Sequence, residues 1–229
     1  MSTINRPQTG TLPPLIAGQR LDRATFHERY EAMPTDTRAE LIGGVVHMPS
    51  PMSVDHGDNN VPLVVWLDRY AESTPGVRAN INSTLLLDEL GEPQPDASLR
   101  ITAECGGQAH IERDYLAGAP ELVVEIARSS RHIDLGAKKD DYERAGVCEY
   151  IVVELDPNKV HLFIRRGDQF AGQEPGPDGL FRSEVFPGLW LDAEALFAED
   201  RARIRAALEQ SMATAEHANF VARLAANRL

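Results

Sequence analysis

The sequence predicts an α/β (α+β) domain in which helices flank a mixed β-sheet, with an N-terminal hairpin and a C-terminal helix. Helix-like and strand-like segments alternate along the 229 residues, which favours this mixed class. Residues 121–126 are dense in Leu, Val and Ile, as expected of a central strand covered on both faces. Two pairs of strand-like segments enclose short turns, Gly43-Gly44 and residues 156–159, which are typical of antiparallel hairpins.

The first quarter of the chain is predicted to hold an arm, a helix and a hairpin. Residues 1–21 form the arm because Pro and Gly recur in them. Asp22 has the side chain of an N-cap, and Pro34 ends the helix that it begins. Residues 38–42 and 45–48 pair across the glycines as the hairpin.

The next segments are predicted to supply a helix and three strands. Residues 55–72 form the helix, and its buried side is expected from Val61, Val64, Val65 and Leu67. Residues 77–87 have strand character. Apolar and polar side chains alternate over residues 97–101, which indicates a half-buried strand before the central one.

The following region is predicted to contain one helix and the second hairpin. Residues 134–145 form the helix, with Asp134 as its N-cap and Gly146 as its stop. Residues 149–155 and 160–166 then form the hairpin.

The C-terminal part is predicted to be mostly helical. A Gly- and Pro-rich loop leads to a short strand and a helix over residues 192–197, and residues 22–198 together form the domain. The last thirty residues contain no Pro or Gly, so residues 199–229 are expected to form one long helix. The apolar stripe of this helix is compatible with packing on its own domain and with packing on a partner helix, and the pattern does not distinguish the two.

Composition and charge narrow the class of protein. The chain has 23 Lys and Arg against 35 Asp and Glu, a net charge of −12, and 42% hydrophobic residues, as in an ordinary globular protein. No apolar run approaches the ~18 residues of a membrane span. The N-terminus lacks a signal layout and the two cysteines form no C-x-x-C pair, so we expect a cytoplasmic protein. Because the chain is acidic, binding of phosphates requires a local basic patch or a metal cation.

Three carboxylates fall where a simple hydrophobic core would not place them. Asp96 follows Pro95 at the entrance of a strand, Glu125 lies in the most apolar strand, and Glu40 lies in the first hairpin. A carboxylate inside a covered strand is costly unless it is paired or bound to a metal. Carboxylates at strand ends are the hard oxygen ligands that Mg²⁺ or Mn²⁺ prefers.

A lysine is predicted to face the same place. At ~100° per residue, Lys138 lies ~30° from the centre of the apolar stripe of residues 134–145, and Lys139 lies ~70° from it. We therefore expect Lys138 to point toward the sheet, where an ammonium group can hold a water or a developing phosphate charge.

Several short motifs follow one another in a distinctive order. They are Pro95-Asp96, Glu121-Leu122-Val123-Val124-Glu125, Asp134-Leu135-Gly136-Ala137-Lys138, Tyr142, Gly146-Val147 and Glu149-Tyr150. The segments 39–44 and 183–189 and His56 extend the pattern. Over about residues 22–198 the sequence resembles the Uma-type "putative restriction endonuclease" family of bacteria, within the PD-(D/E)XK nuclease-like superfamily.

The resemblance implies a restriction-endonuclease-like fold that hydrolyses DNA with Mg²⁺ or Mn²⁺. Asp96 and Glu125 would be the metal-binding carboxylates, and Glu40 the upstream acidic residue. Position 127 is Ala, so the lysine usual two residues after the glutamate is displaced, and Lys138 would replace it on the helix.

Each of these residues also has a structural reading. Asp96 fits a turn aspartate that caps its own backbone, Glu125 fits a partner of Arg128 or Arg131, and Lys138 can extend along its helix to solvent. The candidate substrate contacts are His56, Arg128, Arg131, Lys139 and Tyr142. The basic residues are also explained by a solvated surface, and His56 by a position at the start of a helix.

Two functions from different classes follow. The first is a divalent-metal-dependent endodeoxyribonuclease, for which a homodimer through the C-terminal helix would pair two active sites on duplex DNA. The second is a non-catalytic protein of the same fold that binds nucleic acid or a protein partner. The net charge and the displaced lysine favour this second function.

Overall fold

A six-stranded mixed sheet lies at the centre of the computed structural model, which describes residues 12–48 and 54–228, without the side chains of residues 54–59. The strand order is β11-β10-β9-β8-β5-β3. Its members are β3 (Val77–Ile81), β5 (Ala97–Ile101), β8 (Leu122–Ala127), β9 (Glu149–Leu155), β10 (Asn158–Arg166) and β11 (Gln169–Gln173). Strands β8 and β9 are parallel and every other neighbouring pair is antiparallel. The predicted mixed sheet is confirmed, and β8 is buried along its whole length.

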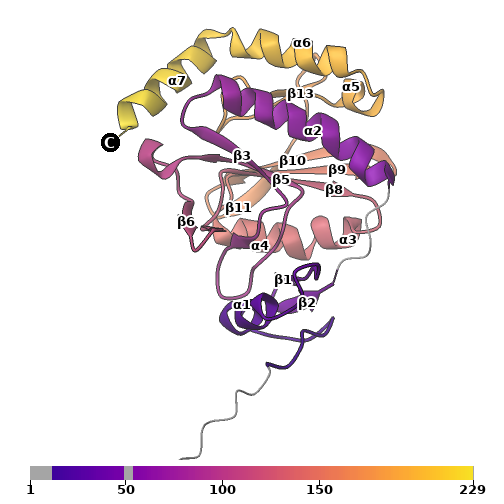
Figure 1. Cartoon of the computed structure of the whole chain (residues 1–229). Coiled ribbons are helices and arrows are strands. Elements are labelled where there is room, and N and C mark those ends of the chain that lie inside the picture. The colour runs from indigo at the N-terminus through magenta and orange to yellow at the C-terminus, as the bar shows by residue number, and fades with distance from the viewer. Residues whose placement is uncertain (1–11, 49–53, 229) are drawn as a thin grey trace, which may run out of the picture.

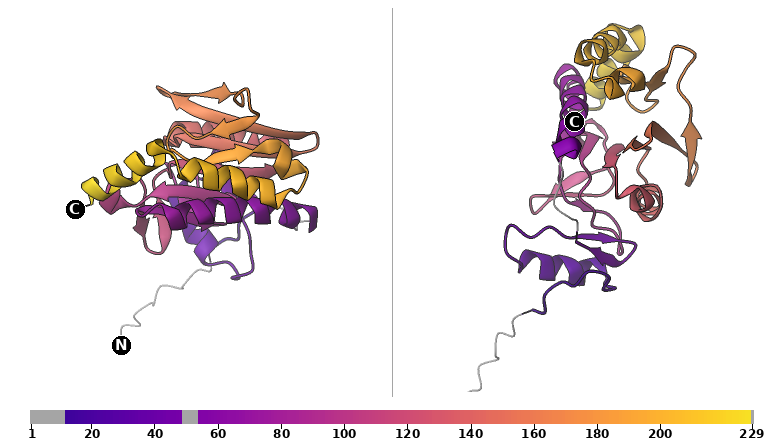
Figure 2. Two further views of the ribbon diagram at one scale, coloured as in Figure 1. Left: turned by 90° about the horizontal axis from the view of Figure 1, so that it is seen from above. Right: turned by 90° about the vertical axis from the view of Figure 1, so that its right-hand side faces the viewer.

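Helices cover both faces of this sheet (Figures 1 and 2). One face carries α2 (Val54–Ser73), α5 (Ala193–Phe197), α6 (Arg201–Met212) and α7 (Ala215–Asn227). The other face carries α3 (Arg131–Asp134) and α4 (Ala137–Ala145), which connect β8 to β9. The parallel pair therefore encloses a helical crossover, as parallel neighbours require.

Smaller elements surround the sheet. The hairpin of β1 (Glu40–Ile42) and β2 (Val45–His47) packs with α1 (Arg23–Glu31), and Asp22 accepts a hydrogen bond from Thr25 N as the predicted N-cap. The other elements are β4 (Leu85–Leu86), β6 (His110–Glu112), β7 (Tyr115–Ala117), β12 (Leu180–Arg182), β13 (Trp190–Asp192) and the short 3-10 helix η1 (Ala103–Cys105). The second predicted hairpin is present as β9 and β10. The predicted strand over residues 77–87 is interrupted, because Asn82 has a φ of 49°.

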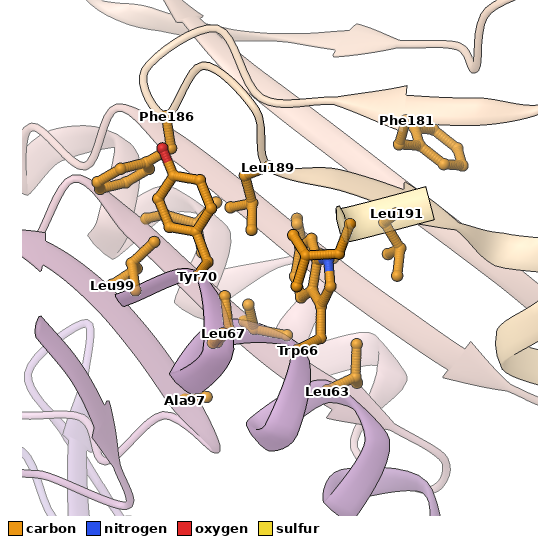
Figure 3. Packing of buried hydrophobic residues seen from close by; sticks show 14 of the residues in the cluster. Leu63, Trp66, Leu67, Tyr70, Ala97, Leu99, Phe181, Phe186, Leu189 and Leu191 are labelled. Carbon is orange, nitrogen blue, oxygen red and sulfur yellow. The ribbon is translucent and has the colours of Figure 1, made fainter. Parts of the chain in front are cut away.

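The buried side of α2 differs from the prediction. Leu63, Trp66, Leu67 and Tyr70 form the buried stripe and pack against residues such as Leu99 of β5 (Figure 3). The buried residues are three and four positions apart, so Val61 and Val65 lie on the neighbouring row of the helix surface. These two valines are 49% and 45% exposed, so the expectation that they are buried is wrong.

The helix predicted over residues 134–145 is two helices. Gly136 between α3 and α4 has φ −117° and ψ −106°, which is not helical. Asp134 therefore ends α3 and is buried, and it is not the N-cap that the sequence indicated. Gly146, with φ 95°, ends α4 in the left-handed conformation as predicted.

The C-terminal segment is also two helices and not one. Thr214 is the N-cap of α7 and accepts a hydrogen bond from His217 N, so the chain turns between α6 and α7. The turn allows Leu208 from α6 and Phe220 from α7 to reach the same core. No helix in the described part of the chain has the length and apolar content that a membrane span needs.

Candidate active site

Strands β5 and β8 place two of the predicted carboxylates opposite each other. Ala97 pairs with Val124 in an antiparallel register. Asp96 and Glu125 are the next residues on each side of this pair, so they face each other across the two strands. Both are buried, at 8% and 4% exposure. Asp96 Oδ2 accepts a hydrogen bond of 2.7 Å from Ile126 N, which fixes Asp96 to the neighbouring strand.

Lys138 extends from α4 to the same place. Its Nζ lies 2.9 Å from Glu125 Oε1 and 3.0 Å from Glu40 Oε1. The lysine is 6% exposed, so the alternative in which it extends to solvent is wrong. The partner of Glu125 is therefore this lysine, whereas Arg131 contacts Glu154.

Glu40 joins the N-terminal elements to this cluster. Its Oε1 also accepts a hydrogen bond of 2.6 Å from Gln94 N, in the segment that leads to Asp96. Backbone hydrogen bonds between Leu41 and Glu92 hold the same segment to β1. The hairpin thus delivers a carboxylate and also positions the approach to Asp96.

One further carboxylate completes the acidic cluster, which we define as Glu40, Asp96, Glu125 and Asp134 around Lys138. Asp134 Oδ1 lies 3.9 Å from Lys138 Nζ, whereas the sequence predicts only a capping role for Asp134. Its spacing of four residues before Lys138 was the signal that could have found it, because such residues share a helix face. Tyr142, a predicted substrate contact, is fully buried and donates a hydrogen bond of 2.8 Å to Glu125 Oε1.

Burial and charge repulsion decide the protonation of the cluster. Burial raises the pKa of Glu125 well above its ordinary value, and Asp134, Asp96 and Glu40 raise it further against the opposing effect of Lys138. Burial also raises the pKa of Asp134. For Lys138, burial alone would lower the pKa, but Glu125, Glu40 and Asp134 outweigh it and raise the pKa. The lysine is therefore an ammonium group at neutral pH.

The donor set fits a divalent cation in chemistry and charge. With all five groups ionised, the acidic cluster carries three more negative than positive charges in a buried place, which is unfavourable without a further cation or proton. Carboxylate oxygens are the ligands of Mg²⁺ and Mn²⁺. Within the described residues, however, no three Asp, Glu, His or Cys side chains are already arranged to bind a metal ion. The Lys138 ammonium supplies the positive charge among the carboxylates.

The predicted substrate contacts do not form one patch of unpaired cations. Arg131 contacts Glu154, and the Lys139 ammonium lies 5.0 Å from the centre of the Phe163 ring. Arg128 is exposed beyond the end of β8. His56 lies in α2, and its side chain is outside the described residues.

A histidine that the sequence analysis did not single out lies beside the acidic cluster. His47 on β2 is the cross-strand partner of Glu40. Burial lowers the pKa of His47, and Glu40 opposes that effect. Only the hairpin register reveals this neighbour, because no metal or catalytic motif contains His47.

The fold is that of an α+β protein in which helices flank a mixed sheet, and the sheet carries the acidic cluster. A family model described as "Uma2: Putative restriction endonuclease" matches residues 24–194, and the chain belongs to this family. Among solved structures, the chain is similar to "a putative nuclease belonging to DUF820" from Anabaena variabilis ATCC 29413. The TM-score is 0.59 at 17% sequence identity, over 75% of this chain and 96% of that chain, so this likeness concerns the fold. No curated protein matches the sequence.

Proposed function

We propose that this protein is a divalent-metal-dependent endonuclease that hydrolyses phosphodiester bonds of DNA. The observation that carries the proposal is the convergence of Asp96, Glu125 and Lys138, which are distant in sequence, in one buried cluster. Membership in a family described as restriction endonucleases and the fold of a nuclease-like neighbour support it.

Asp96 and Glu125 would hold Mg²⁺ or Mn²⁺. When bound, such a cation supplies Lewis-acid stabilisation of phosphodiester oxygens and lowers the pKa of a water. Asp96 is already oriented by Ile126 N, and Glu125 by the Tyr142 hydroxyl. These hydrogen bonds reduce the reorganisation that binding of a substrate would otherwise require.

Lys138 would supply the positive charge that meets the phosphate. Its ammonium has three donors, and the contacts to Glu125 and Glu40 use two of them. The remaining N–H can donate a hydrogen bond that orients the attacking water, or one to a phosphoryl oxygen where negative charge develops. Glu40 and Asp134 keep this amine protonated.

The further parts of the proposal concern substrate and setting. Arg128, Arg131 and Lys139 are the candidate contacts to the phosphate backbone, and a homodimer would place two sites on duplex DNA.

Both cysteines are free, Cys105 buried and Cys148 partly buried. Free thiols suit the cytoplasm, which we propose as the location.

A plasmid-nicking assay in Mg²⁺ or Mn²⁺ tests the proposal. The parent should convert supercoiled plasmid to nicked and linear forms, and Lys138→Ala and Glu125→Gln should each lose at least ~100-fold in rate. The matched controls are Lys159→Ala and Glu112→Gln, which change exposed residues far from the cluster in sequence. An inactive parent contradicts the proposal, and an active Lys138→Ala variant contradicts the role of the lysine.

A non-catalytic protein of the same fold is the second candidate. It is favoured because Lys138 is already paired with two carboxylates and because no metal-binding group of three is formed among the described residues. Titration with Mn²⁺ separates the two candidates. A metal-dependent nuclease should gain thermal stability that Asp96→Ala and Glu125→Ala both abolish, whereas a scaffold should gain none.

A further inference from the structure

A groove lies between α2 and α6, on the face of the sheet opposite the acidic cluster. The two helices run side by side in both views (Figures 1 and 2). The groove has a volume of about 190 Å³. Its floor is apolar and consists of Trp66, Ile204 and Leu208, and the half-exposed Val61 and Val65 extend it along α2.

Three guanidinium groups form the rim of this groove. Arg69 follows Val61 and Val65 on one row of α2, because the three residues are four apart. Arg201 and Arg205 form the corresponding row on α6. Among the described residues, Arg69 and Arg201 form no side-chain hydrogen bond or ion pair, and Arg205 has only a 3.7 Å contact with Glu209. A protein of net charge −12 thus gathers three positive charges around one apolar surface, and two of them have no ion pair among the described residues.

We infer that this groove docks an acidic amphipathic helix of a partner protein. An apolar floor between two helices is the geometry of helix-in-groove recognition, in which side chains three and four residues apart act as anchors. Carboxylates flanking those anchors would pair with Arg69, Arg201 and Arg205. The groove volume is below the ~300–1,000 Å³ of most small-molecule sites, but it suits a few anchoring side chains.

Charge disfavours a second copy of this chain as the occupant of the groove. In a symmetric dimer through this groove, the same surface of each copy would meet, so the arginine rims of both copies would be gathered in one interface. Like charges placed opposite each other in an interface are unfavourable. The inferred partner is therefore a different, acidic chain. This docking does not depend on the proposed nuclease activity, because the groove and the acidic cluster lie on opposite faces of the sheet.

Fluorescence anisotropy with two labelled peptides tests the inference on the full-length chain. One peptide carries leucines at helical spacing flanked by glutamates, and the other carries lysines in place of the glutamates. The glutamate peptide should bind, and its affinity should fall as salt is raised, because the rim charges are exposed. The lysine peptide should bind about ten-fold more weakly or not at all.

Two charge-matched double variants identify the site. Arg69→Glu with Arg201→Glu should weaken binding of the glutamate peptide about ten-fold or more, whereas Arg78→Glu with Lys159→Glu should not, since those exposed residues lie outside the groove. Equal loss in both variants, equal binding of both peptides, or no binding of the glutamate peptide overturns the inference. So does a dimer of the protein alone that Val65→Glu converts to a monomer, or binding to anionic lipid vesicles without binding to the peptide.

Discussion

At the scale of single residues, Lys138 is the buried cation around which the acidic cluster is arranged. It is the only lysine or arginine buried within the described part of the chain, and three carboxylates lie within 4 Å of its ammonium group. One positive charge cannot neutralise four buried carboxylates, so the remaining acids either bind protons more tightly than usual or carry an unfavourable negative charge. An unfavourable free energy of this kind is common at sites that bind a cation or stabilise a developing charge.

Asp134→Asn should therefore stabilise the protein at neutral pH. Burial raises the pKa of Asp134 above its ordinary 3.8, so the folded state binds this proton more tightly than the unfolded state does. The stability contributed by that proton is present at low pH and is lost as pH rises from about 3.8 through the higher folded pKa. At neutral pH we expect a gain of about 1 kcal/mol, or ~2–4 °C in Tm.

Thermal melting across the acidic to neutral range measures this effect. The advantage of Asp134→Asn should shrink toward low pH, and the exposed Asp140→Asn should melt like the parent throughout. A lower Tm for Asp134→Asn at neutral pH would show that its contact with Lys138 outweighs the repulsion between the carboxylates.

At the scale of elements, the joint between α3 and α4 decides which side chains reach the acidic cluster. Gly136 turns the chain so that Asp134 from the end of α3 and Lys138 from the first turn of α4 both lie near Glu125. The glycine is needed because a β-carbon at position 136 would lie 2.6 Å from His132 O.

Gly136→Ala should loosen this joint. The clash with a backbone oxygen cannot be relieved by a side-chain rotation, so the start of α4 must shift, at a cost of about 1–3 kcal/mol in the free energy of unfolding. Nicking activity should fall with it, because Lys138 is two residues away. Chemical denaturation measures the cost, and Gly172→Ala is the matched control because a β-carbon there meets nothing within 4 Å. Equal stability of the two variants would contradict this role of the joint.

The strands β5, β8, β9 and β10 and the central residues of the cluster were predictable, whereas the breaks within the helices and the exact surroundings of the cluster were not. Glu125 and Lys138 break an apolar period, so local pattern identifies them. Asp134 escaped because an aspartate at a helix start usually caps the backbone, and the non-helical conformation of Gly136 has no signature in periodicity. The buried side of α2 was misassigned because the valines of residues 61–65 are as apolar as the true stripe, and only packing against the sheet distinguishes the two rows.

At the scale of the whole molecule, both ends of the chain are tied to the central sheet. The N-terminal hairpin contributes Glu40 to the acidic cluster. On the opposite face, Leu208 and Phe220 of the two C-terminal helices belong to the same hydrophobic core as Leu99 and Leu122 of the sheet. Strand β8 connects the two regions, because its alternate residues face α2 on one side and Lys138 on the other.

Phe220→Ala should therefore destabilise the whole domain and not the last helix alone. Phe220 is 2% exposed, and its ring meets Phe186 edge-on with centroids 6.2 Å apart. Removing such a ring costs about 3–5 kcal/mol in the free energy of unfolding. Because the cavity would open in the core shared with β8, the far-ultraviolet and tryptophan signals should shift together to lower denaturant, and the exposed Asn219→Ala should leave both in place. Two separate transitions, with the loss confined to one of them, would instead show that the C-terminal helices unfold independently of the sheet that holds Asp96 and Glu125.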